Sequence, residues 1–80
     1  MKNKKISSPI SPMSVEILGT RELLISGCTG IIHFSKEKIG VHTKGPSVWV
    51  SGDDLTLCWA GDGKLMIKGR VCAVEYKGEQ

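Results

Sequence analysis

The sequence has little of what a metal centre or a disulfide framework needs. Its cysteines and histidines are Cys28, His33, His42, Cys58 and Cys72. The number of cysteines is odd and no C-x2-C pair occurs, whereas structural zinc sites usually draw their ligands from such short knuckles. We therefore predict no metal and no cofactor, and we expect the three cysteines to behave as small hydrophobic residues.

Long hydrophobic runs are also missing. No segment approaches the roughly 20 apolar residues of a membrane-spanning helix. No apolar signal-peptide core follows the lysines near the N-terminus. The sequence therefore favours a cytoplasmic protein.

Outside the first five residues the sequence has no excess of basic charge. The formal net charge of +3 comes from Lys2, Lys4 and Lys5, and the remaining eight basic residues balance eight acidic ones. A nucleic-acid-binding domain is expected to carry a basic stripe of its own. We therefore expect no nucleic-acid partner. Trp49 and Trp59 could stack on nucleic-acid bases, so the alternative function is a small β-barrel that binds nucleic acid.

Catalytic motifs are absent as well. The letters S-x-x-K occur at 35–38, but that motif needs a helix in a large α/β domain and two companion motifs. Gly61 and Gly63 are not followed by the strand–helix unit of a phosphate loop. Asp53 and Asp54 do not fit the spacing of a calcium loop. We predict no enzyme and no small-molecule substrate, and a metal- or thiol-dependent enzyme is the third interpretation.

Short strand-like runs are what the sequence does contain. Short runs of alternating apolar residues recur about every 8–12 residues with turn residues between the runs, which is typical of all-β domains. We predict a small antiparallel β-sandwich, or a meander or barrel, of about seven or eight short strands. This single domain covers residues 13–77, after a flexible basic tail at 1–12 and before a short C-terminal end at 78–80.

A glycine follows an apolar strand pattern three times, at 23–27, 48–52 and 65–69. The intervals between these glycines are 25 and 17 residues, which is too uneven for the equal rungs of a short β-solenoid, the alternative fold. An Asp-Gly pair at 62–63 predicts a tight hairpin. We expect structural turns at Gly27, Gly52, Gly63 and Gly69.

The alternation of side chains also predicts an apolar outer surface. If the residues on either side of them line the core, parity sends Leu24, Trp49 and Met66 to the opposite face. An exposed apolar stripe usually marks an interaction surface. We therefore expect these three residues to pack against another chain in a homo-oligomer.

Four segments resemble the YabP/YqfC family of sporulation proteins. They are VEILGTRELLISG at 15–27, GIIHFSKEKIGVHT at 30–43, SVWVSGDDLTL at 47–57 and LMIKGRVCAVEY at 65–76. The resemblance implies a non-enzymatic protein made in the mother cell of endospore-forming bacteria, without established catalytic residues. It also implies a structural or assembly factor, peripheral at the forespore membrane, that binds itself or a membrane-associated sporulation protein.

Overall fold

The computed structural model describes residues 12–78, and their regular structure consists of β-strands only. The predicted tail therefore lies outside the described residues, apart from Pro12. The strands are β1 (Ser14–Leu18), β2 (Glu22–Ser26), β3 (Cys28–Phe34), β4 (Lys38–Thr43), β5 (Ser47–Gly61) and β6 (Lys64–Lys77).

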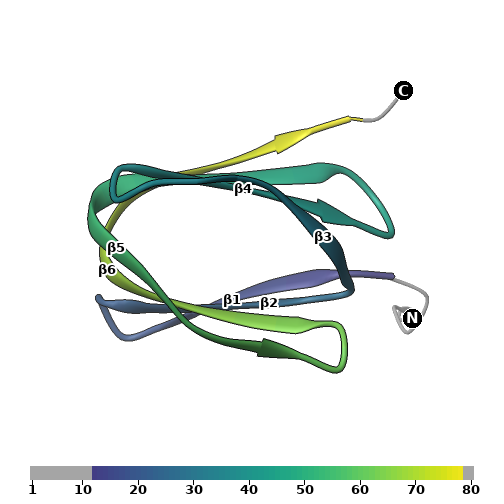
Figure 1. Cartoon of the computed structure of the whole chain (residues 1–80), viewed down its shortest axis with the longest axis horizontal. Coiled ribbons are helices and arrows are strands. Elements are labelled where there is room, and N and C mark those ends of the chain that lie inside the picture. Colours follow the sequence, from purple (N-terminus) through teal and green to yellow (C-terminus); the bar gives the residue numbers. More distant parts are fainter. Residues whose placement is uncertain (1–11, 79–80) are drawn as a thin grey trace, which may run out of the picture.

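The strands form one open sheet in the order β1-β2-β6-β5-β4-β3 (Figure 1). All neighbouring strands run antiparallel. The predicted all-β antiparallel fold is confirmed, and the solenoid alternative is wrong, because hydrogen-bonded neighbours are hairpin partners or crossovers and not stacked rungs.

The two longest strands bend, and the sheet folds over onto itself (Figure 1). β4 pairs with β5 only at 48–51, and β2 pairs with β6 only at 64–68. A first layer therefore contains β3, β4, the first half of β5 and the second half of β6. A second layer contains β1, β2, the second half of β5 and the first half of β6. The two layers enclose the core.

The bend is made by β-bulges at two of the predicted glycines. Pairing between β5 and β6 shifts register between Ser51 and Gly52 and again between Asp53 and Thr56. Gly69 has a φ of 133°, and a Cβ atom there would lie 2.5 Å from the carbonyl oxygen of Asp54. Bulges bend a strand without ending its pairing. Residues 12–78 therefore form six strands and not seven or eight, because each predicted pair of short strands around a bend is one long strand.

The core lies between the layers and is entirely aliphatic. Nine hydrophobic residues are buried, and no polar or charged residue is buried among the described ones. Each fully buried side chain of this kind contributes about 1.5–3 kcal/mol. Apart from Leu55 in the bulge, the buried hydrophobic residues of a strand are two positions apart, which confirms the predicted alternation. The nine residues are Leu23, Ile25, Ile39, Val41, Val48, Val50, Leu55, Leu65 and Ile67.

One turn closes the β5–β6 hairpin, and two other turns hold the bend from outside. Asp62 and Gly63 have φ of 53° and 72° and close the β5–β6 hairpin, as predicted. The β3–β4 turn then reaches the bulge, where the amide of Leu55 donates to the carbonyl of Lys36 at 2.8 Å. On the other side, the amide of Gly69 donates to the carbonyl of Arg21 at 3.0 Å. In the described residues there is no helix long and apolar enough to cross a membrane.

Candidate interaction face

Folding the sheet leaves free strand edges in both layers. Within residues 12–78, β3 and β1 each pair with one neighbour only. The segment 56–61 of β5 pairs with β6 alone, and the segment 70–77 of β6 pairs with β5 alone. Each such edge presents backbone N–H and C=O groups that can hydrogen-bond to an added strand. The exception is the first residue of β3, since the amide of Cys28 already donates to the carbonyl of Gly63 at 2.9 Å.

Two of these edges, one from each layer, border the same pocket. The pocket has a volume of about 350 Å³ and is lined by the beginning of β3, the end of β5 and the residues just after the β5–β6 turn. We name the surface formed by Cys28–Phe34 and Thr56–Gly61 the open face. In Figure 1 both segments lie toward the viewer.

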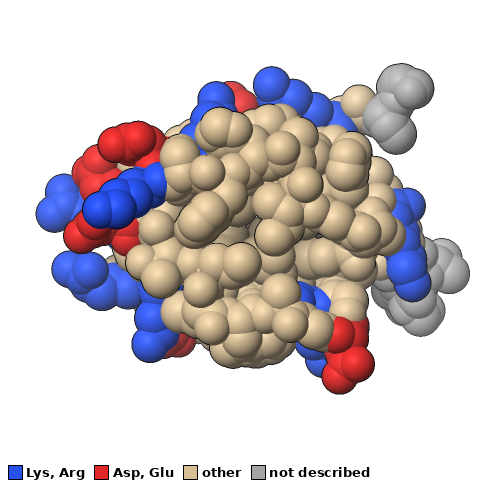
Figure 2. Space-filling view, viewed as in Figure 1, with Lys and Arg blue, Asp and Glu red and all other residues tan. Residues whose placement is uncertain are grey.

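The open face has no residue of fixed charge. Neither of its two segments contains a Lys, Arg, Asp or Glu residue. Figure 2 shows a broad uncharged surface on this side of the molecule, with charged side chains at its margins. The other two edges differ, since β1 contains Glu16 and the second half of β6 contains Arg70, Glu75 and Lys77. Charged residues on an edge discourage the addition of another strand, and the open face has none. Its protection is limited to the register shifts within 28–33 of β3 and at 57–59 of β5.

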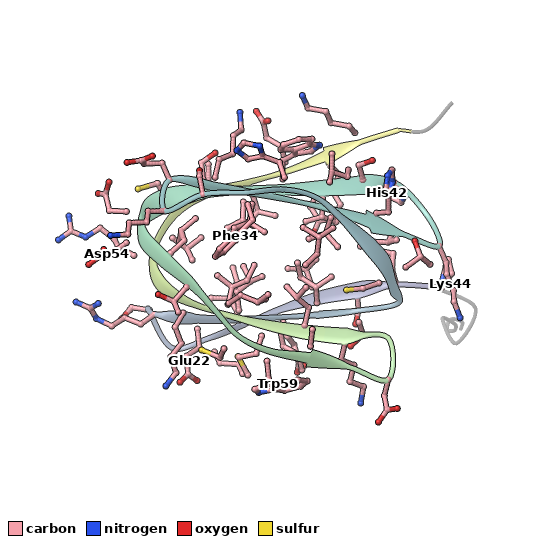
Figure 3. The ribbon with its side chains drawn as sticks, viewed as in Figure 1. Glu22, Phe34, His42, Lys44, Asp54 and Trp59 are labelled. Carbon is pink, nitrogen blue, oxygen red and sulfur yellow. The ribbon has the colours of Figure 1, made fainter. Side chains whose placement is uncertain are left out.

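Large apolar side chains are exposed on the open face. Ile31 is 46% exposed, Ile32 39%, Phe34 53% and Trp59 48%. Phe34 is paired with the buried Ile39, so it belongs to the core side of an edge strand that no further strand covers. Figure 3 places Phe34 over the space between the layers and Trp59 on the outside of the second layer.

The single-strand pattern does not predict the open face, because the face depends on which strands lie at an edge. Its β3 and β5 segments are separated by more than twenty residues of sequence. The one signal available in the sequence is the absence of charge from 28–34 and from 55–61. Such a gap also fits a buried strand, so only the strand order gives it a meaning.

The structure separates the three residues predicted to form an outer stripe. Leu24 and Met66 are cross-strand partners on the outer surface of the second layer. Trp49 lies in the first layer, opposite Gly40 on one side and Glu75 on the other. Leu24, Trp49 and Met66 are all partly buried. Their role in binding another chain stays a prediction.

Trp49 is covered within its own layer. A Cβ atom on Gly40 would lie 2.6 Å from Trp49 Cζ3, so the indole ring rests on the Gly40 backbone. The Nζ atoms of Lys38 and Lys77 lie 5.6 and 5.5 Å from the centroid of the ring. The ring centroid of His33 lies 6.3 Å away. The two lysine contacts are within range of cation–π attraction. Together with Gly40 and His33 they limit how much of the indole ring a partner can contact.

The cysteines and histidines do not converge. Among the described residues there is no group of three side chains able to hold a metal ion. Cys28 is partly buried, its Sγ donates to the carbonyl of Ile25 at 3.5 Å, and burial raises the pKa of its thiol. A thiol of raised pKa is a poor nucleophile. Cys58 and Cys72 are exposed.

The comparison with protein families gives one match. The model of the YabP family matches residues 11–80, so the chain belongs to the YabP family and the predicted resemblance is confirmed. No curated protein and no solved structure matches the chain. Membership of the family suggests a role related to sporulation, and the YabP family is not a known enzyme family.

Proposed function

We propose that this chain is a non-enzymatic structural or assembly factor of endospore formation that binds another protein chain through the open face. The observation that carries the proposal is the pair of uncharged, unpaired strand edges that border one pocket. The partner is a second copy of the chain or a membrane-associated sporulation protein.

Strand addition explains why such a face suits binding. An added strand gains main-chain hydrogen bonds from the edge, while neighbouring apolar side chains supply the contact energy. The exposed Ile31 and Phe34 belong to the core side of β3, so an added strand would extend the existing core.

A nucleic-acid partner has weaker support. Phe34 and Trp59 could stack on bases, but neither segment of the open face contains a lysine or arginine. Binding of single strands combines stacking with a positively charged groove. The open face offers only the first of these two contributions.

We place the protein in the cytoplasm of the mother cell, where its partner holds it at the forespore membrane. Membership of the YabP family, which suggests a role related to sporulation, supports this part of the proposal.

A pair of lysine substitutions on two different edges tests the proposed function. Ile32→Lys adds a charge to the open face, whereas Ser14→Lys adds the same charge to β1, at an exposed position. Each allele replaces the natural gene in a sporulating strain, and heat-resistant spores are counted after immunoblots confirm equal protein levels. We expect Ile32→Lys to lower the spore count and Ser14→Lys to leave it unchanged. Equal counts for Ile32→Lys and the natural protein would contradict the proposal.

A further inference from the structure

We infer that the occupant of the open face is a second copy of this chain, related by a two-fold axis perpendicular to the two layers. The inference rests on the proposed function and names its partner. It follows from the charge of the face, from the position of its two edges and from the protection of the other edges.

The charge of the open face permits contact with itself. In a two-fold contact each surface patch meets its own copy, so any charged residue near the axis faces a like charge. The segments 28–34 and 56–61 contain no Lys, Arg, Asp or Glu residue. Lys64 also lines the pocket, but it is the first residue of β6 and belongs to neither edge segment.

The position of the two edges allows one axis to satisfy both. A two-fold axis perpendicular to the first layer makes β3 antiparallel to its copy. Because the second layer is stacked on the first, the same axis makes 56–61 of β5 antiparallel to its copy. Both layers then continue from one protomer into the other, and the exposed side chains of Ile31 and Phe34 are covered. The pocket lies at the ends of the two edges, next to the β5–β6 turn, so Lys64 in its lining is at the margin of the contact.

The remaining edges limit the assembly to two copies. β1 contains Glu16, and the segment 70–77 of β6 contains Arg70, Glu75 and Lys77. Charged edges of this kind resist further strand addition. A two-fold contact is also closed, so it does not generate a filament.

Sedimentation velocity of the full chain over a wide range of concentrations tests the inference. We expect the natural protein and Ser14→Lys to form the same dimer. Ile32→Lys should raise the dissociation constant of the dimer about 100-fold or more, since two ammonium groups then meet near the axis. An unchanged dissociation constant for Ile32→Lys would overturn the inference.

Native cysteines provide a second measurement that does not depend on Ile32→Lys. Cys58 lies near the middle of the β5 edge, and Cys72 lies on the β6 edge. The double variant Cys28→Ser, Cys72→Ser keeps Cys58 alone, and its matched control Cys28→Ser, Cys58→Ser keeps Cys72 alone. Under mild oxidation we expect covalent dimers from the first variant only, since a disulfide needs Cα atoms about 4.4–6.8 Å apart. Covalent dimers from Cys72, or none from Cys58, would overturn the inference.

The failure of this inference can be told from failure of the proposed function. If the chain is a monomer at every concentration while Ile32→Lys still lowers the spore count, the second copy is wrong and a different protein binds the open face. If Ile32→Lys leaves the spore count unchanged, the proposed function itself is wrong.

Discussion

The bend between the layers can be tested by four glycine-to-alanine substitutions that separate steric contact from backbone strain. A Cβ atom at Gly61 meets nothing within 4 Å, and φ is not positive there. Gly19 has equal space but a φ of 70°. Gly52 has no positive φ, but its Cβ atom would collide with the carbonyl oxygen of Arg70. Gly69 combines a φ of 133° with close contact to the backbone of β5.

The expected changes in the free energy of unfolding follow from these two terms. Gly61→Ala should be neutral or stabilise by about 0.5 kcal/mol, because alanine restricts the unfolded chain. Gly19→Ala should destabilise by about 1 kcal/mol, the usual cost of a left-handed non-glycine residue. Gly52→Ala should destabilise by about 3 kcal/mol, because a backbone oxygen in a paired strand cannot move aside as a side chain does. Gly69→Ala bears both terms and should lose about 4 kcal/mol.

Urea unfolding followed by tryptophan fluorescence measures these values. For a domain of this size, 1 kcal/mol corresponds to a shift of about 4–8 °C in Tm. The expected loss of about 4 kcal/mol in the Gly69→Ala variant is a large part of the total stability of a typical domain, which is about 5–15 kcal/mol. All four variants are compared at one low protein concentration, because self-association would add to apparent stability. If Gly52→Ala were as stable as Gly61→Ala, the steric account of the bend would be refuted.

Three further predictions concern the first layer and the cysteines. Gly40→Ala should displace the indole ring of Trp49, shift its fluorescence and destabilise the fold by about 1–3 kcal/mol, whereas Gly30→Ala, with no contact closer than 3.9 Å, should do neither. Trp49→Ala should lower stability and leave the dimer dissociation constant unchanged; a weaker dimer would instead favour the outer stripe as the binding surface. Cys28 should react with a thiol reagent more slowly than Cys58 at mildly alkaline pH, because burial raises the pKa of its thiol. The stability that this raised pKa reflects is present below the ordinary thiol pKa and declines as the pH rises above it, which pH-dependent unfolding can measure.

Local pattern was enough to predict the strands, their inward residues and the hairpin turn. The alternation in β2 and β4 predicts which side chains are buried, because a strand has a period of two and one face packs on the core. The same pattern cannot distinguish a bulge from a strand end. Gly52 and the two aspartates after it therefore suggested a turn. In the structure β5 pairs with β6 on both sides of the bulge, and the amides of Gly52 and Leu55 donate to carbonyl groups of the β3–β4 turn, so β5 is continuous.

Side-chain parity is also local, and this explains why the three residues of the predicted outer stripe are separated in the structure. Parity places Trp49 and Met66 on the side of the sheet away from the core, but the sheet folds at the bend between them. Two residues that share a sheet surface in an unbent sheet then lie on opposite outer surfaces. Which surfaces meet is decided by long-range pairing, which a single sequence does not show.

The bend and the open face have one cause. β4 pairs with β5 only as far as Ser51, and the bulge that follows carries the rest of β5 into the second layer. The segment 56–61 is an edge because of this departure. A substitution that opens the bend, such as Gly69→Ala, should therefore weaken self-association under conditions where the protein is still folded, since the two edges of the open face would no longer be aligned. Loss of stability at Gly69 without any effect on the dimer would mean that the contact uses one layer only.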